Sequence, residues 1–390
     1  MKDDAPAADV GPVRSRELRP FRIEVPGAAV SDLARRLART GFAADSPGAD
    51  DWDRGVPDSF VRQLVSRWRD DFDWHAWESK LNNYPQYRTV IDGQPIHALH
   101  IRAPMPNALP LILTHGWPGS VLEYLDIIDV LGAEFDLVIP SLPGFGFSSA
   151  PVQPGWNRRT TARAWAELMR RLGYTRYGAV GNDLGANVSL ELGRVDRDRI
   201  AGVHVTQIFS GPKGTPGELD DLSRDDRDRL RALAAFRARR GAYLGFQSSQ
   251  PLTIAHALAD SPAALLAWHG QLVDDSVHPD FAIATAALYW LTGTAASALH
   301  YYHQDAHISQ PTEPTTVPVA VAEFADDVFR SVRAFAHRDH SNIVSWHEYE
   351  GGGHFAAHQS PHLLAHDIRT FFTAMRTSPA DESGAQTAAR

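Results

Sequence analysis

The chain has 390 residues, of which 43% are hydrophobic and 22% charged, and its net charge is -9 at pH 7. This length and composition are typical of a folded globular protein with one large core and an insertion or an extension. Acidic and basic residues are interleaved, which argues against a nucleic-acid partner, and the lack of cysteine excludes disulfides, thiol chemistry and cysteine-ligated metals.

The two ends of the chain are rich in Ala, Ser, Asp and Gly, so residues 1–17 and 377–390 are predicted to be mobile tails. The first residues show neither the basic start nor the apolar stretch of a signal peptide, and no segment offers ~18 uninterrupted apolar residues. We therefore expect a cytoplasmic protein without a membrane partner. The sequence does not determine the oligomeric state, and we consider a homodimer.

Helical patterns come first along the chain. In residues 30–42 and 58–72 apolar side chains recur at spacings of three and four, which predicts amphipathic helices. They belong to an N-terminal helical extension, 18–85, that we expect to pack on the core. Residues 89–103 are then typical of a β-hairpin, because an Asp-Gly turn separates two strand-like segments.

Short apolar runs bounded by Gly and Pro predict strands that are buried on both faces of a parallel sheet. Helical segments between them complete the alternating order of an α/β architecture. The runs lie at 109–116, 135–141, 317–324 and 343–351, and a further strand ends at residue 181.

Residues 211–310 lose the strand pattern and are predicted to be mostly helical. This block separates two parts of the core, 86–210 and 311–376, and the second part closes with a helix at 361–376. A helical block inserted between sheet strands is what a lid over an active site would look like.

The most informative segment is Gly-Asn-Asp-Leu-Gly at 181–185, a predicted strand-to-helix turn. Small residues two before and two after Asp183 permit the cramped backbone of a nucleophile elbow. The alternative is that Asp183 only caps the helix, since Asp is favoured there. Ser148 also stands between small residues, but it follows a Pro-Gly loop and is interpreted as a loop residue.

The segment His-Gly-Trp-Pro-Gly-Ser at 115–120 follows a predicted strand directly. In a nucleophile-elbow site one oxyanion donor is the N–H after the nucleophile, and the other comes from the loop after an earlier strand. Leu184 and Trp117 are the matching positions. The alternative for the second segment is a plain Gly-Pro turn.

His354 follows three glycines and the last predicted strand, where the base of such a site should fall. A carboxylate after the preceding strand would hold its imidazole in one tautomer. Glu323, Asp326 and Asp327 all satisfy that position, and spacing does not choose among them. Other histidines have spacings that mimic a metal site, but we expect no metal; they are His300, His303, His307, His358, His362 and His366.

Four motifs in this order resemble those of the microsomal-type epoxide hydrolases of the α/β-hydrolase superfamily. They are HGWPGS (115–120), LPGFGFS (142–148), GNDLGA (181–186) and GGGHFAA (351–357). The resemblance runs from about residue 18 to 376 and rests on the set of motifs. It implies an α/β-hydrolase fold and hydrolysis of a small-molecule epoxide to a vicinal diol through an aspartyl ester, without a cofactor.

The resemblance also implies roles for single residues. Asp183 is then the nucleophile, His354 the base and Asp327 the acid that orients it. Two lid tyrosines donate to the epoxide oxygen in the family; one matches Tyr243 and the other falls at Tyr301 or Tyr302, of which we favour Tyr302. Gln247 is an alternative group for polarising that oxygen.

The aromatic residues Trp117, Phe145, Phe246 and Trp290 suggest a large apolar pocket for a bulky aryl epoxide. The composition resembles that of actinobacterial proteins, and the chain resembles bacterial epoxide hydrolases of antibiotic biosynthesis, the enediyne pathways included. Two rival functions stay open at this point. One is a haloalkane or haloacid dehalogenase, which uses the same arrangement of Asp, acid and His, and the other is a catalytically silent binding scaffold.

Overall fold

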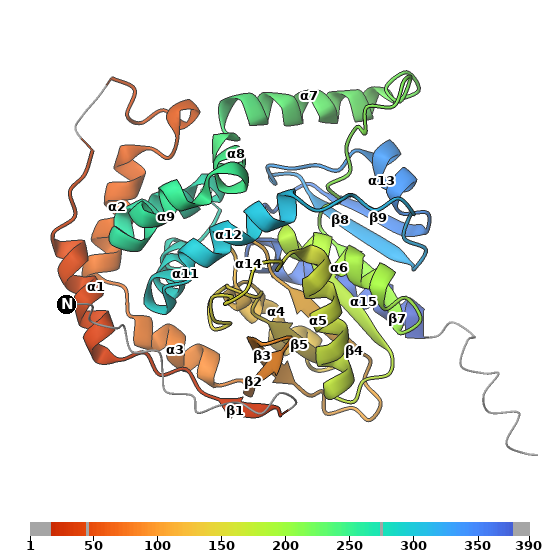
Figure 1. The fold of residues 1–390 in the computed structure, drawn as a ribbon, viewed down its shortest axis with the longest axis horizontal. Helices are drawn as coiled ribbons and strands as arrows, with labels where there is room; N and C mark the ends of the chain where they lie inside the picture. Colours follow the sequence, from red (N-terminus) through yellow and green to blue (C-terminus); the bar gives the residue numbers. More distant parts are fainter. Residues whose placement is uncertain (1–16, 44–46, 274–275, 377–390) are drawn as a thin grey trace, which may run out of the picture.

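The computed structural model of the chain describes residues 17–43, 47–273 and 276–376. The tails predicted at 1–17 and 377–390 lie outside these ranges, apart from Glu17. In the described part of the chain a nine-stranded sheet has the order β1-β2-β3-β5-β4-β6-β7-β8-β9 (Figure 1). The strands are β1 (Arg19–Phe21), β2 (Gln86–Ile91), β3 (Gln94–Ile101), β4 (Pro110–Thr114), β5 (Asp136–Pro140), β6 (Tyr177–Gly181), β7 (Ile200–Val205), β8 (Val319–Phe324) and β9 (Ile343–Tyr349).

The sheet joins an antiparallel part to a parallel part. Strands β1, β2, β3 and β5 pair antiparallel, whereas β5, β4, β6, β7, β8 and β9 pair parallel. Every residue of β4, β5 and β6 is buried, as expected of strands that are covered on both faces. The predicted α/β fold with a mostly parallel sheet is confirmed.

Helices cover both faces of this sheet. In β7, Gly202 lies against Phe371 of α15, whereas its neighbour Val203 lies against Gly193 of α6; successive strand residues point to opposite faces. The first α-helices are α1 (Gly27–Ala38), α2 (Asp58–Asp70), α3 (Trp74–Asn82), α4 (Leu125–Leu131), α5 (Arg158–Arg171) and α6 (Leu184–Val195). Helix α13 (Arg333–Asp339) lies between β8 and β9, and α14 (Ala356–Gln359) and α15 (Pro361–Arg376) follow β9. Short 3-10 helices are η1 (Trp52–Arg54), η2 (Val121–Tyr124) and η3 (Gly270–Leu272).

The helical insertion lies between β7 and β8 in the chain and occupies the residues of the predicted lid. Figure 1 shows α8, α9, α11 and α12 gathered beside the N-terminal helices, with α7 crossing one end of the molecule. The insertion consists of α7 (Arg224–Arg239), α8 (Ala242–Ser249), α9 (Pro251–Asp260), α10 (Pro262–His269), α11 (Pro279–Thr292) and α12 (Ala295–Ala306). Among the described residues no single helix is long and apolar enough to cross a membrane; α11 and α12 reach that size only as a pair bent by 93°.

The N-terminal extension contacts the lid as well as the sheet. Its strand β1 pairs with β2 at the edge, while α1 and α2 contact α10 and α11. Arg67 of α2 donates to both carboxylate oxygens of Asp280 on α11, at 2.6 and 2.9 Å. We expected the extension to be helical and to pack on the core, whereas it also supplies a strand and supports the lid.

Strand β7 was missed by sequence analysis. Its sequence, IAGVHV, is interrupted by a glycine and a histidine, which weakens a strand pattern. Both residues are explained by contacts with α15. A Cβ on Gly202 would lie 2.7 Å from the Phe371 ring, and His204 Nε2 lies 2.8 Å from Asp367 Oδ1. The missed strand matters because it leads directly to a residue of the candidate site.

Candidate active site

Asp183 stands at the sharp turn between β6 and α6. Its backbone has φ 50° and ψ -125°, a conformation that costs a non-glycine residue about 1–3 kcal/mol. The flanking glycines make the turn possible: a Cβ on Gly181 would lie 2.2 Å from the Gly185 carbonyl oxygen, and one on Gly185 would lie 1.8 Å from that of Thr114. The turn therefore has the backbone geometry of a nucleophile elbow, and Asp183 makes no side-chain cap hydrogen bond of an ordinary helix cap.

The loop after β4 lies against this elbow. Thr114 at the end of β4 pairs with Gly181 at the end of β6, so the two following loops leave the sheet side by side. The backbone N–H of Trp117 donates to Asp183 Oδ1 at 2.9 Å. A Cβ on Gly116 would lie 2.3 Å from the Asp183 Cβ, which explains the glycine in this segment. Leu184 begins α6, so its N–H is one of those without an intrahelical partner.

His354 and Asp327 approach Asp183 from the loops after β9 and β8. His354 Nδ1 lies 3.1 Å from Asp327 Oδ1, and His354 Nε2 lies 3.9 Å from Asp183 Oδ2. Burial alone would lower the pKa of His354, but Asp327 and Asp183 raise it to about 9. A charged imidazole therefore lies between two carboxylates in the resting site.

The geometry distinguishes the three acid candidates that spacing left open. Glu323 is buried, and its carboxylate accepts from Arg229 at 2.6 Å and from the Ser331 N–H at 2.6 Å. Asp326 is exposed. Asp327 alone of the three contacts the His354 ring.

Gln207 connects the nucleophile to the acid and was not predicted. Its Oε1 accepts from the Asp183 N–H at 2.8 Å and from Thr206 Oγ1 at 2.8 Å, and its Nε2 donates to Asp327 Oδ2. The side chain is fully buried. Gln207 follows β7, so recognising that strand would have placed it at the same sheet edge as the other site residues.

One of the predicted tyrosine donors contacts Asp183. Tyr302 on α12 donates its hydroxyl to Asp183 Oδ1 at 3.1 Å, whereas Tyr301 pairs with Thr161 Oγ1 at 3.0 Å. Burial and then the Asp183 charge raise the pKa of Tyr302 well above its usual range. Burial and then the charges of Asp183 and Asp327 also raise the pKa of Tyr243 on α8.

The residues expected to line the pocket differ in how deeply they are buried and in what they contact. Gln247 is fully buried, with neither side-chain polar atom hydrogen-bonded. Phe145 is fully buried, with its ring 6.0 Å from the Trp117 ring. Phe246 is 39% exposed, because α8 turns Gln247 inward, and the Trp290 ring lies under the Arg36 guanidinium at 5.4 Å. The place of Phe246 and Trp290 in the wall of the site stays a prediction.

Ser148 has a structural role away from the nucleophile. It is fully buried; its Oγ donates to the Ser141 carbonyl oxygen at 2.8 Å and accepts from the His97 N–H at 3.0 Å. The histidine series on α12 places the His303 and His307 rings 4.4 Å apart. Across the described ranges, no group of three or more His, Asp or Glu side chains is arranged to hold a metal ion.

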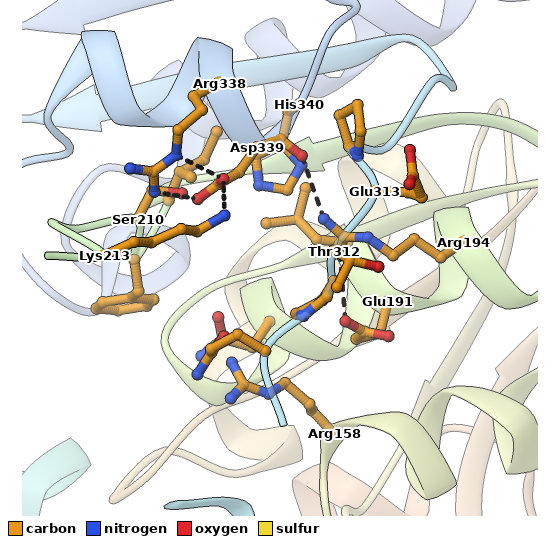
Figure 2. Close-up of a pocket in the computed structure, with 17 residues that line it drawn as sticks. Arg158, Glu191, Arg194, Ser210, Lys213, Thr312, Glu313, Arg338, Asp339 and His340 are labelled. Carbon is orange, nitrogen blue, oxygen red and sulfur yellow. Dashed lines mark hydrogen bonds and ion pairs between the residues drawn. The ribbon is translucent and has the colours of Figure 1, made fainter. Parts of the chain in front are cut away.

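A hollow of about 310 Å³ lies outside this site (Figure 2). None of Asp183, Asp327 and His354 lines it. Its cationic side chains are paired with carboxylates: Figure 2 shows Lys213 beside Asp339, at 2.7 Å, and Arg194 beside Glu191, at 3.3 Å. The hollow therefore has no part in the chemistry assembled around Asp183.

Comparisons with known proteins agree with this geometry. A family model described as "Epoxide hydrolase N terminus" matches residues 18–124, and one described as "alpha/beta hydrolase fold" matches residues 110–361. A Stigmatella aurantiaca protein named "Putative epoxide hydrolase" is 40% identical over 379 residues, or 92% of this chain and 86% of that protein. Epoxide hydrolase 1 of Sus scrofa is 28% identical over 94% of this chain and 91% of its own.

The chain is also similar to solved structures of epoxide hydrolases. The structure of an Aspergillus niger epoxide hydrolase has a TM-score of 0.83 and 29% sequence identity, and the match covers 93% of this chain and 97% of that one. The resemblance drawn from the four sequence motifs is confirmed.

Proposed function

This chain belongs to the epoxide hydrolases of the α/β-hydrolase fold, and on that premise we propose that Asp183 opens the epoxide ring as a nucleophile. The observation that carries the proposal is the environment of the Asp183 carboxylate. One oxygen, Oδ1, accepts from the Trp117 N–H and the Tyr302 hydroxyl, and the other, Oδ2, lies 3.9 Å from His354 Nε2 with no hydrogen bond from the described residues. A fixed carboxylate with one oxygen free is suited to attack at carbon.

In the first step, Asp183 Oδ2 forms a bond to a ring carbon while the carbon–oxygen bond of the epoxide breaks. The leaving oxygen takes a proton from Tyr302 or Tyr243, because an alkoxide is a stronger base than a tyrosinate. Burial keeps both hydroxyls protonated before the reaction by raising their pKa values. As ester formation removes the Asp183 charge, one cause of that raised pKa disappears and proton donation becomes easier.

In the second step, water attacks the ester carbonyl carbon of Asp183, and His354 Nε2 accepts a proton from it. The N–H groups of Trp117 and Leu184 stabilise the oxyanion of the tetrahedral intermediate. Collapse breaks the bond between the carbonyl carbon and the diol oxygen, which leaves with the proton of the new carboxyl group. Before the attack the resting imidazolium of His354 gives its proton to the tyrosinate, and the proton taken from the water then restores the imidazolium, so the net change is epoxide plus water to diol.

The charges suit this order of events. In the resting site the Asp183 carboxylate helps to raise the pKa of His354 to about 9, so the imidazole is protonated at neutral pH. Conversion of that carboxylate into a neutral ester removes one of the raising charges. The pKa of His354 then falls, and the ring becomes a base when water must be deprotonated.

A dehalogenase needs a cradle for a halide ion in place of proton donors. The Tyr302 hydroxyl at Asp183, with Tyr243 beside it, fits an oxygen leaving group that must gain a proton. A silent scaffold would have no use for a strained carboxylate in contact with these groups. Among the three functions considered, the geometry favours epoxide hydrolysis.

The test is a single turnover of styrene oxide in heavy-oxygen water. The diol should carry unlabelled oxygen from Asp183, and Asp183→Asn should lose turnover. His354→Gln should accumulate a covalent ester that mass spectrometry detects as a protein mass increase. New oxygen from solvent in the first turnover, or release of halide from haloalkanes without epoxide turnover, would contradict the proposal.

We further propose a bulky aryl epoxide as the substrate. Rings packed around the loop of the oxyanion donor support an apolar site: the Trp117 ring lies 6.0 Å from Phe145 and 4.6 Å from Tyr289. A panel of epoxides should then show kcat/KM rising with aryl size. A preference for small aliphatic epoxides would contradict this. A place in antibiotic biosynthesis stays a prediction.

A further inference from the structure

Glu123 is a buried carboxyl group beside the candidate site, and it takes no part in the two steps proposed for Asp183 and His354. It belongs to η2, which follows the loop of the oxyanion donor, and the residue is 1% exposed. Its Oε2 has no hydrogen-bond partner among the described residues. The same oxygen lies 2.6 Å from the point where a Cβ on Gly119 would stand, so the glycine leaves room for it.

Burial of this group requires an explanation. A buried carboxyl group without full hydrogen bonding costs several kcal/mol, and such groups are usually paired with a cation. The groups that act on Glu123 are His354, Asp183, Asp327 and the side-chain amide of Asn182. All of them belong to the site or adjoin it: Asn182 precedes the nucleophile, and its Nδ2 donates to the His354 carbonyl oxygen at 3.4 Å.

The attacking water needs a second partner in addition to His354. Asp327 is occupied, since Oδ1 contacts His354 and the Phe329 N–H and Oδ2 accepts from Gln207. Gln207 Oε1 already accepts two hydrogen bonds. A water held by His354 alone could rotate away from the ester carbon. Among the described residues, Glu123 Oε2 is an unpartnered acceptor in the helix that follows the Trp117 loop.

We propose that the Glu123 carboxyl group holds the water that hydrolyses the Asp183 ester, opposite His354. Glu123 is then a positioning residue for the second step, and the assignment rests on the ester mechanism proposed above. One hydrogen of the water goes to His354 Nε2 and the other bonds to Glu123 Oε2. No proton is transferred to Glu123.

The charge state of Glu123 is compatible with this role. Burial raises the pKa of Glu123 to about 8, against the opposing effect of His354. A neutral carboxyl group adds no third negative charge beside Asp183 and Asp327 in the resting site, and it can still donate and accept hydrogen bonds. Formation of the ester and then of the imidazolium both favour its ionised form, which is the better acceptor for the water.

The experiment measures the two chemical steps separately by rapid quench and mass spectrometry of the ester. Glu123→Ala should slow ester hydrolysis by about tenfold or more, which corresponds to the loss of about one hydrogen bond. The rate of ester formation should stay within about threefold of the wild-type rate. Glu123→Gln keeps an acceptor oxygen and should be slowed less. In wild type, hydrolysis should respond to pH below the resting pKa of about 8, because the ester no longer carries the Asp183 charge, and this response should be absent in Glu123→Gln.

Two further variants keep the inference open to refutation. Gly119→Ala should push the Glu123 carboxyl group away and slow hydrolysis selectively. Glu191→Gln removes a buried carboxylate on α6 outside the site, so both steps should be unchanged in this control. An equal loss of both steps in Glu123→Ala, or hydrolysis at the wild-type rate, would overturn the role of Glu123. Absence of any ester in wild type would instead overturn the mechanism on which it rests.

Discussion

Replacing Gly116 by alanine should disable the nucleophile while the fold persists. The new Cβ would lie 2.3 Å from the Asp183 Cβ, 2.4 Å from its Oδ1 and 2.7 Å from its Cγ, whereas ordinary contacts are 3.4–4 Å. Asp183 must therefore move by about 1 Å, and a displacement of that size costs about 100-fold in rate, or about 2.7 kcal/mol of transition-state stabilisation. Gly116 has no positive φ, so alanine adds no backbone strain there.

Rapid-quench measurement of ester formation tests this, with far-UV circular dichroism and the thermal midpoint as checks on folding. Gly211→Ala is the matched control, because a Cβ there has nothing within 4 Å. The control should form ester at the wild-type rate. Ester formation by a folded Gly116→Ala within threefold of wild type would refute the claim that contact with Gly116 fixes the carboxylate.

Other substitutions address the remaining groups. Tyr302→Phe should slow ring opening by roughly 100-fold, the usual contribution of a positioned acid, whereas Tyr301→Phe should not; equal rates in both variants would refute the assignment. Gln207→Leu leaves buried partners unsatisfied and should lower the free energy of unfolding by about 1–3 kcal/mol in urea titration; unchanged stability would contradict its bridging role. The raised pKa of His354 stabilises the fold fully below pH ~6.5, and this is lost as pH rises through about 9. The free energy of unfolding of wild type should therefore fall by up to roughly 3 kcal/mol relative to that of His354→Gln over that pH interval. Parallel curves of unfolding free energy against pH for the two proteins would refute this.

Features that depend on neighbouring residues could be read from the sequence. The elbow at Asp183 needs a glycine at 181, because a Cβ there would lie 2.2 Å from the carbonyl oxygen of Gly185 in the same turn. Such a close approach requires glycine, so it is visible in the sequence as a glycine at a fixed spacing from Asp183. The apolar runs of β4, β5 and β6 are likewise visible, since strands covered on both faces need apolar residues throughout.

Features that depend on how distant elements meet could not be read in this way. Tyr301 and Tyr302 are adjacent on one helix and differ only in which side of α12 faces the elbow, so packing of the lid decided between them. Phe246 had the right chemistry for a pocket wall but lies on the outer side of α8. The acid was likewise chosen among three neighbouring carboxylates by the approach of the β9 loop.

The sequence by itself determined the fold class, and it predicted the elbow and the order of nucleophile, acid and base. Tertiary structure decided which polar side chains complete the site: Gln207 and Glu123 carry no local pattern that sets them apart from other polar residues. Their roles arise from the sheet order, which brings the ends of β4, β6, β7, β8 and β9 to one edge. Local steric needs are met by neighbours in the chain, whereas hydrogen-bond partners of buried groups come from segments that only the fold brings together.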